Sequence, residues 1–275
     1  MTANTQTPLP SVASTAAVPP RVFNVIGTDL LATDYESLVD DLIASWRKGE
    51  PRTLSFCNTY MVARRRHIPA YREVCAVCDT SLPDGMPLIW CMNSQGAGMM
   101  DRVYGPIFME RFIRRSPREI RHYFLGGDVE CLRRLCENAQ QLNPDLQLVG
   151  SQHGFLSEKD DPVLLAEIDA CEPDFIWIGM GTPKQDEWAA RNRAHFSKAI
   201  LLPVGSSFEI LAGVKGIPPM FFQKLGLTWF FRMCSEPGRL IPRYVKWNSL
   251  FLFYLLRDLL LGTPTRRSGA TTSSS

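Results

Sequence analysis

The sequence predicts an α/β protein built on a parallel sheet with helices on both of its faces. Short runs rich in β-branched and aromatic residues alternate along the chain with longer segments whose apolar residues recur at helical spacing. Such alternation favours parallel strands joined by crossover helices. The chain has 275 residues, a length that suits one such domain with an appendage.

The strands are predicted from their β-branched and aromatic content. They are expected at residues 21–30, 52–58, 120–127, 146–154 and 173–183, and segment 198–213 is expected to run from strand through a glycine turn into a helix. Ligands of parallel α/β sheets bind at the loops that leave the carboxyl ends of the strands. The candidate binding loops are therefore those after Phe56, Leu125, Ile178 and Val204.

The helices are predicted from apolar spacing and from end signals. They are expected at residues 34–49, 59–79, 87–96, 105–116, 128–142, 161–171 and 184–196. Asp34 is placed to cap the first of them, and Gly49 lies just past its end. The second is expected to break near Pro69, because proline lacks the backbone N–H that a helix interior needs.

Composition narrows the classes of function. The formal net charge of +2 gives no indication of a nucleic-acid partner. Eight cysteines are spread along a chain whose start does not resemble a signal peptide, so we expect reduced thiols and a cytosolic setting. Cys75 and Cys78 have no second pair to complete a zinc site, and the four histidines lack metal-ligand spacing. We therefore expect neither a metal nor a cofactor.

The two ends of the chain differ from its middle. Residues 1–20 carry no charged side chain, and both they and residues 262–275 are expected to be disordered. Between them we expect an α/β domain at 21–214 and an appendage at 215–261. Basic residues in segment 215–258 outnumber acidic ones by seven to two and are interleaved with Trp, Phe and Leu. That mixture is typical of a segment lying in a membrane interface, with buried helix packing as the alternative.

The stretch "TSLPDGMPLIW" at 80–90 sets one acid among apolar residues. The ordinary explanation of Asp84 is a turn, since Asp-Gly is a common turn dipeptide. The alternative is that the turn presents its carboxylate for chemistry. Arg102, in "DRVYG", is open to a similar choice. A lone arginine is usually solvated, but in one cleft with Asp84 it would be suited to bind a substrate phosphate.

Glycine-rich loops follow three of the predicted strands. They are "LGGDVECL", "IGMGTPKQDEW" and "PVGSSFEILAG", which contain Gly126, Gly181 and Gly205. Backbone N–H groups at the helix starts that follow can bind an anion, and Gln185 can reach a ligand from the first helical turn. Each loop also fits a plain strand-to-helix joint, in which Asp128 would cap the helix after the first loop, but three at one sheet edge favour a nucleotide pocket. None of them is a GxGxxG or P-loop motif.

Several motifs together resemble the bacterial WecG/TagA/CpsF glycosyltransferases, which build surface polysaccharides on polyprenyl-diphosphate carriers. The resemblance runs from about Val22 to about Tyr244. The matching stretches are "CN" at 57–58, "LPDGMPLIW", "DRVYG", "FLGG", "GMGTPKQDEW", "PVGSSFEILAG", "QKLGLTWFFR" and "EPGRLIPRY". Their order and spacing are much more specific than any single motif.

The resemblance implies a Rossmann-like α/β domain with a helical C-terminal appendage that associates with a membrane. It implies an inverting, metal-independent glycosyltransferase of surface polysaccharide biosynthesis. The donor would be a UDP-sugar of the hexose or N-acetylhexosamine type, and the acceptor a polyprenyl-diphosphate-linked saccharide. Such an enzyme is expected as a peripheral protein at the cytoplasmic face of the inner membrane, with a homo-oligomer left open.

The same resemblance implies roles for individual residues. Asp84 matches the proposed general base, and Asn58 and Arg102 match two further catalytic positions. Nucleotide and substrate binding is expected at Gln185, Gly126, Gly181, Gly205, Arg232, Arg239 and Arg243. The three C-terminal arginines are implied to cover the nucleotide diphosphate.

The chain departs from the family pattern at three places. Phe56 stands where many relatives have Thr, Ile217-Pro218-Pro219 replaces Arg-Ala-Pro, and Thr228 replaces Glu. These departures bear on the donor sugar and the acceptor, and they leave the reaction class standing.

Two other functions remain open on the residues alone. A nucleotide-binding oxidoreductase would suit the alternating pattern, but the glycine fingerprint with its downstream acid is missing. A non-catalytic membrane-surface protein would suit the appendage. A transferase needs Asp84, whereas a scaffold does not.

Overall fold

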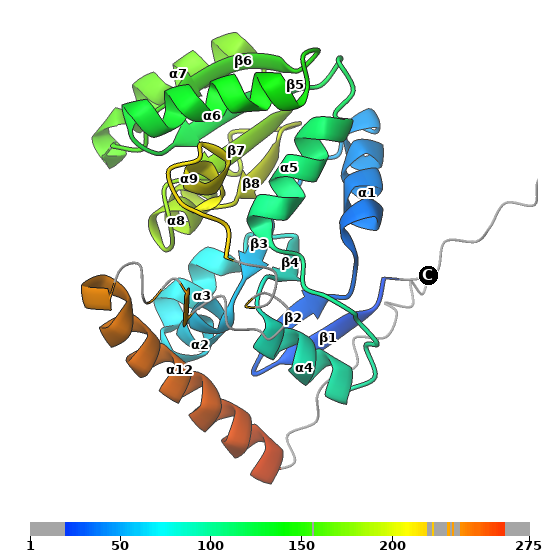
Figure 1. The fold of residues 1–275 in the computed structure, drawn as a ribbon, viewed down its shortest axis with the longest axis vertical. Helices are drawn as coiled ribbons and strands as arrows, with labels where there is room; N and C mark the ends of the chain where they lie inside the picture. The colour runs from blue at the N-terminus through cyan, green and yellow to red at the C-terminus, as the bar shows by residue number, and fades with distance from the viewer. Residues whose placement is uncertain are drawn as a thin grey trace, which may run out of the picture.

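The computed structural model of the protein describes residues 20–155, 157–218, 222, 230, 231, 233 and 237–261, without the side chain of residue 239. The strands are β1 (Val22–Val25), β2 (Thr28–Leu31), β3 (Leu54–Cys57), β4 (Thr80–Pro83), β5 (Arg121–Gly126), β6 (Gln147–Gln152), β7 (Phe175–Gly179) and β8 (Ile200–Pro203). The α-helices are α1 (Tyr35–Arg47), α2 (Thr59–His67), α3 (Pro69–Cys75), α4 (Met86–Ser94), α5 (Gly105–Arg115), α6 (Val129–Leu142), α7 (Asp161–Cys171), α8 (Lys184–Asn192), α9 (Ser207–Leu211) and α12 (Pro237–Leu260). Figure 1 shows their arrangement.

The central strands are parallel, as the sequence predicts. Four of them form a sheet in the order β6-β5-β7-β8, and β3 pairs in parallel with β4. The N–H of Leu201 in β8 donates to the carbonyl of Arg52 at 2.8 Å, and Thr53 bridges to Leu201 in parallel. The β3–β4 pair therefore continues the line of the larger sheet beside β8. All six strands consequently end at the same edge.

Helices cover both faces of this sheet, which confirms the predicted α/β class (Figure 1). Side chains alternate along a strand, so β7 serves two cores. Phe175 and Trp177 pack into a cluster with residues of α1, α5, α6 and α9. Ile176 and Ile178 pack into a second cluster with residues of α7 and α8.

A third apolar cluster joins the C-terminal helix to the domain. Trp247 and Phe251 of α12 are buried against residues of α2, α4 and the β1–β2 hairpin. The ring of Trp247 meets that of Tyr60 edge to face, with centroids 5.5 Å apart. Most of residues 219–236 lie outside the described residues, so the boundary of the appendage at residue 215 stays a prediction. Within the described ranges, no helix is both long and apolar enough to cross a bilayer.

The sequence prediction is wrong at two strands. Residues 21–30 form an antiparallel hairpin, not a single strand, because Ile26 and Gly27 turn the chain with φ of 43° and 89°. Two successive positive φ values are what a tight hairpin turn requires. No strand was predicted at residues 80–83, but they form β4 and pair with β3.

Other local predictions are confirmed. Asp34 caps α1 by accepting a hydrogen bond from the N–H of Ser37 at 2.9 Å, and Pro69 starts a new helix after α2. The described cysteines are free thiols. The ends predicted to be disordered, 1–20 and 262–275, lie outside the described residues except for residue 20.

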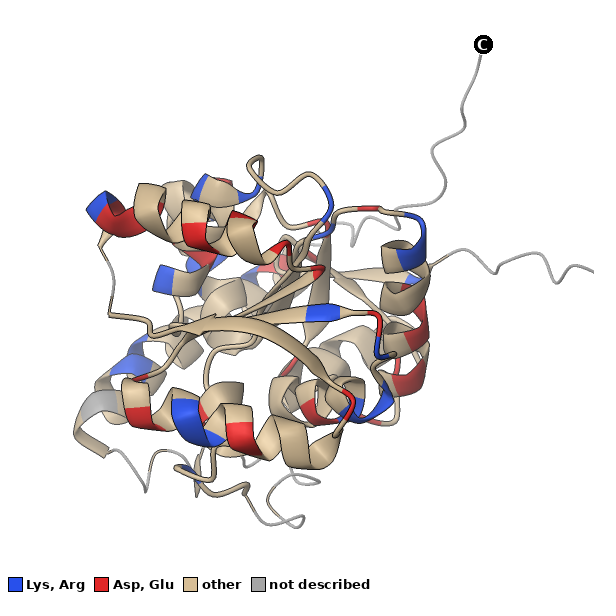
Figure 2. Ribbon diagram, turned by 90° about the horizontal axis from the view of Figure 1, so that it is seen from above, with Lys and Arg blue, Asp and Glu red and all other residues tan. Residues whose placement is uncertain are grey.

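Charged side chains are mixed over the outer helices (Figure 2). Arg115 of α5, for example, binds both Glu36 and Asp40 of α1, the latter at 2.6 Å. Such exposed pairs contribute little stability each. Their mixture is in keeping with the small formal net charge of +2.

Candidate functional site

Asp84 leaves the sheet at the carboxyl end of β4. Its N–H donates to the carbonyl of Cys57 at 2.7 Å, which extends the β3–β4 pairing by one residue. Its half-buried carboxylate accepts a hydrogen bond at Oδ1 from the N–H of Gly105, the first residue of α5, at 3.2 Å. The acid is thus held at the sheet edge by a helix start, where backbone N–H groups lack partners within the helix.

Arg102 lies beside this acid, as the sequence suggested. Its side chain is buried, and one guanidinium nitrogen lies 3.4 Å from the carbonyl oxygen of Asp84. The guanidinium also stacks over the ring of Tyr104, 4.3 Å from its centroid. Arg102 is therefore packed into the wall of the Asp84 turn and is not a solvated surface arginine.

Asn58 is brought next to Asp84 by the pairing of β3 with β4. It caps α2, because its side-chain oxygen accepts a hydrogen bond from the N–H of Met61 at 3.2 Å. A Cβ at Gly85 would lie only 3.7 Å from the Cα of Asn58. The Asp-Gly turn and the start of α2 are therefore in close approach, and the structure places Asn58, Asp84 and Arg102 together.

Gln185 connects two of the glycine-rich loops. Its buried side chain accepts a hydrogen bond at Oε1 from the N–H of Gly181 at 3.1 Å. Gly205 approaches it so closely that a Cβ there would lie 3.2 Å from the same oxygen. Gly205 has a φ of 56°, and Gly181 one of 77°. The loops after β7 and β8 thus meet at the Gln185 amide.

Gly126 allows the backbones of β5 and β7 to meet at their carboxyl ends. A Cβ at this position would lie 2.4 Å from the carbonyl carbon of Gly179, a distance that no side chain could occupy. The N–H of Gly127 donates to the carbonyl of Gly179 at 3.2 Å. The glycine requirement here comes from close strand packing, and Asp128 caps α6 as the plain alternative predicted.

The C-terminal arginines are placed only in part. Arg243 of α12 stacks over the ring of Tyr60, with its guanidinium carbon 3.7 Å from the centroid. Tyr60 lies two residues after Asn58, and the hydroxyl of Thr59 donates to Asn248 of α12 at 3.0 Å. The start of α2 is thus a direct contact of α12. Arg232 and the side chain of Arg239 lie outside the described residues.

Asp186 is a buried acid of this region that the sequence argument did not single out. It follows Gln185 in the first turn of α8 and accepts a hydrogen bond from the hydroxyl of Tyr71 on α3 at 2.7 Å. Burial raises the pKa of its carboxyl to about 6. In sequence it resembles an ordinary first-turn acid, so only the tertiary packing distinguishes it.

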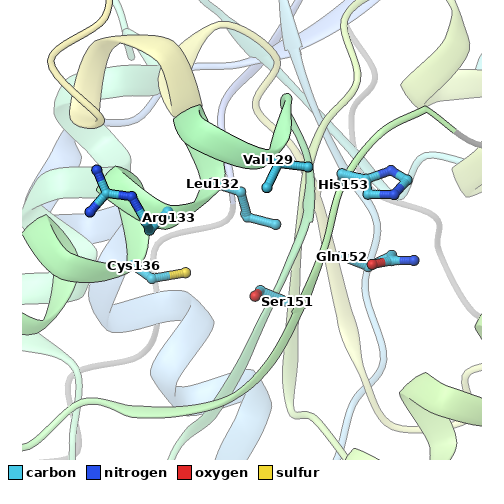
Figure 3. A pocket seen from close by; sticks show the side chains of 7 residues that line it. All are labelled: Val129, Leu132, Arg133, Cys136, Ser151, Gln152 and His153. Carbon is cyan, nitrogen blue, oxygen red and sulfur yellow. The ribbon is translucent and has the colours of Figure 1, made fainter.

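The sequence also gave no sign of a cavity of about 280 Å³ beside β6. Its walls come from α6 and from the polar end of β6, as Figure 3 shows. The lining residues are Val129, Leu132, Arg133, Cys136, Ser151, Gln152 and His153. The N–H of Gly154 donates to the carbonyl of Gly127 at 2.9 Å, so the cavity flanks the first glycine-rich loop. No cluster of His, Cys, Asp or Glu suited to a metal ion occurs within the described ranges.

Comparison with known proteins adds an independent finding. Residues 23–264 match the glycosyl transferase WecG/TagA/CpsF family. A protein of Bacillus spizizenii named N-acetylglucosaminyldiphosphoundecaprenol N-acetyl-beta-D-mannosaminyltransferase is 26% identical over 183 residues, covering 64% of this chain and 70% of its own. A Staphylococcus aureus protein of the same name is 27% identical over 220 residues, covering 79% and 86%. Because the family match spans nearly all of the described structure, this chain belongs to the WecG/TagA/CpsF family of glycosyltransferases.

Proposed function

We propose that the protein transfers a sugar from a UDP-sugar to a polyprenyl-diphosphate-linked saccharide, with inversion, without a metal, and with Asp84 as general base. The observation that carries this proposal is the position of Asp84. It stands at the carboxyl edge of the sheet, where the chain next to it closely approaches Asn58, and it lies against Arg102. Ligands of parallel α/β sheets bind at this edge.

The proposed reaction needs one base. The carboxylate of Asp84 takes the proton of an acceptor hydroxyl as that oxygen attacks the anomeric carbon of the donor sugar. The bond from that carbon to the diphosphate breaks, and UDP leaves with the electron pair. The hydrogen bond from the N–H of Gly105 keeps the carboxylate oriented toward the edge of the sheet. A single displacement of this kind inverts the anomeric configuration.

Stabilisation of the leaving diphosphate is assigned to the cationic groups around the edge. Arg243, above Tyr60, is suited to bind phosphate oxygens in place of a metal. Gln185 contributes by holding the Gly181 loop, whose N–H donates to its amide oxygen. Arg232 and Arg239 are proposed partners of Arg243 on the basis of the family pattern.

The relatives support the kind of donor and acceptor. Their names describe transfer of N-acetylmannosamine to N-acetylglucosaminyldiphosphoundecaprenol. We propose a UDP-hexose or UDP-N-acetylhexosamine donor and a polyprenyl-diphosphate-linked acceptor of the same chemistry here. Phe56 bears on this choice, because its buried ring lies 4.0 Å from a Cβ built on Gly105. The Phe56 ring packs beside Gly105, whose N–H binds the carboxylate of Asp84. Phe56 therefore influences the substrate pocket through the position of Asp84.

We further propose that the protein is peripheral at the cytoplasmic face of the membrane that carries this acceptor. The outward side of α12 supports docking, since it exposes apolar side chains at spacings of three, four and seven residues, which lie on one side of a helix. They include Ile241, Val245, Leu252, Leu256 and Leu259, and Leu256 is 58% exposed. Lys246 and Arg257 lie on the same helix and would favour anionic headgroups.

The test is a transfer assay with a panel of UDP-sugars, short-chain polyprenyl-diphosphate acceptors and EDTA. Asp84→Asn keeps the shape of the side chain but removes its basicity, so kcat should fall by about 10²-fold or more. Asp145→Asn serves as the matched control, because Asp145 is exposed at the amino end of β6, away from the reactive edge. Full turnover by Asp84→Asn would refute the base assignment, and loss of activity in EDTA would refute metal independence.

A further inference from the structure

The buried carboxyl of Asp186 stands out because the proposed chemistry does not use it. It is 4% exposed, although it lies in the first turn of α8, where an acid is usually solvated. The hydroxyl of Tyr71 donates to its Oδ2 at 2.7 Å, and the side chain of Thr182 also hydrogen-bonds to it. The carboxyl thus connects α3 with both ends of the Gly181–Gln185 loop.

These contacts join two parts of the candidate site that follow different strands of the sheet, β7 and β3. Gln185 and Gly181 belong to the β7 side, whereas Asn58 starts α2 on the β3 side. Tyr71 lies on α3, which follows α2 after one residue. Thr182 also contacts α2, since its hydroxyl lies 3.8 Å from the sulfur of Met61. Asp186 is therefore the polar link between the start of α8 and the α2–α3 pair.

A buried arginine, Arg65, stabilises the negative charge of the Asp186 carboxylate. Arg65 of α2 is 7% exposed, and its guanidinium donates to the hydroxyls of Ser81 and Ser55 at 2.8 Å and 2.7 Å. Its positive charge favours the ionised form of Asp186. An amide of the same shape would fill the space of the carboxyl but could not make this charge interaction or accept as strong a bond from Tyr71.

We infer that Asp186 is a positioning residue, whose carboxylate, held by Tyr71, sets the Gly181–Gln185 loop at a constant distance from Asn58 and Asp84. This inference rests on the proposed function, since the loop is taken to bind the nucleotide-sugar donor. Without the bond between Asp186 and Tyr71, the Gly181–Gln185 loop would occupy its binding conformation for a smaller fraction of the time. The affinity for the donor would therefore fall more than the rate of the chemical step.

The kinetic test compares three full-length variants with the wild-type protein. Asp186→Asn should raise the KM for the UDP-sugar about tenfold and change kcat by less than about twofold, the effect expected for one lost charge-assisted hydrogen bond. Tyr71→Phe removes only the donor hydroxyl and should raise the same KM about three- to tenfold. Asp161→Asn is the matched control. Asp161 is also buried and also binds α8, through Trp188 at 3.1 Å and Arg191 at 3.2 Å, but it does not touch the loop.

Hydrogen exchange provides a readout that does not depend on catalysis. The N–H of Gly181 and of Gln185 should exchange faster in Asp186→Asn and Tyr71→Phe than in the wild-type protein, and should be unchanged in Asp161→Asn. Unchanged exchange, or an equal rise of KM in all three variants, would overturn the inference. If the wild-type protein neither bound nor used any UDP-sugar, the proposed function would fail, while the exchange result would still decide the positioning role.

Discussion

Asn58 and Gln185 each hold the backbone of a loop while standing at the edge where the chemistry is proposed. Asn58 accepts from the N–H of Met61, and Gln185 accepts from the N–H of Gly181. A substitution at either residue would therefore change both the local backbone and the polar surface offered to a ligand. Asp84 likewise contacts the start of a helix, because its carboxylate accepts from the N–H of Gly105, the first residue of α5.

Adding a single Cβ atom at Gly126 is predicted to destabilise the protein. Gly126→Ala would place a Cβ 2.4 Å from the backbone of Gly179 at a φ of 138°, so the ends of β5 and β7 would have to separate. We expect the free energy of unfolding to fall by about 2–4 kcal/mol, measured by urea denaturation. Gly181→Ala is the control. It has a positive φ of 77° but nothing within 4 Å, and should cost about 1 kcal/mol. Equal losses would contradict the packing argument.

What the sequence could predict about single residues depended on how local their roles are. Asp34 and Asp128 were expected as caps, and both are, because capping requires only neighbours along the chain. The grouping of Asp84 with Arg102 was expected from the family pattern, and the geometry brings them together. Asp186 was missed because its partner, Tyr71, is distant in sequence and no pattern of spacing connects them.

At the level of elements, the sequence predicted most helices and strands but misjudged two short strands. The hairpin of β1 and β2 depends on Ile26, a β-branched residue with a φ of 43°, where sequence rules expect extended backbone. Strand β4 is short and ends in Pro83, so its composition resembles a turn. Both strands are defined by their pairing partners, and local composition does not contain that information.

The C-terminal helix α12 carries a prediction of its own. Replacing Leu252 and Leu256 together by Glu should reduce binding to phosphatidylglycerol vesicles at least tenfold in a flotation assay. The reason is that burial of each exposed leucine in the lipid would contribute about 1.5–3 kcal/mol to the binding free energy. Val163→Glu is the control, since Val163 is 65% exposed on α7, outside the proposed docking surface. Undiminished binding by the double variant would remove α12 as the docking element.

At the level of the whole molecule, two buried groups, His122 and Asp186, make opposing contributions to the dependence of stability on pH. His122 is buried between Ser116 and Trp177, and burial lowers its pKa from 6.5 to about 3. The unfolded chain therefore binds the proton more readily, and the free energy of unfolding falls as pH falls below about 6.5. For Asp186 burial raises the pKa from 3.8 to about 6, so the folded protein binds the proton more readily, and stability falls as pH rises through that window.

The variant Asp186→Asn separates these two contributions. It removes a cost of roughly 3 kcal/mol that ionisation of a buried carboxyl imposes near pH 7, while His122 continues to titrate. The groups that interact electrostatically with Asp186 include Tyr71, Thr182, Arg65, Glu187, Cys75 and Cys78. We expect the stability of the variant relative to the wild-type protein to be higher at pH 7 than at pH 4, whatever the weakened bond to Tyr71 costs at both values, measured by urea denaturation. A difference that does not vary with pH would contradict the assignment.

The contact of α2 with α12 has a consequence for where the chemistry takes place. Packed helices lie about 8–10 Å apart between their axes, so with the outer side of α12 in the lipid, α2 stands one helix above it. The headgroup layer of a bilayer is about 5–8 Å deep on each side. Asn58, at the start of α2, would then lie at the outer surface of the headgroup layer. A lipid-linked diphosphate could thus reach the reactive edge with its hydrocarbon tail still among its neighbours, and no step would have to lift the lipid into water.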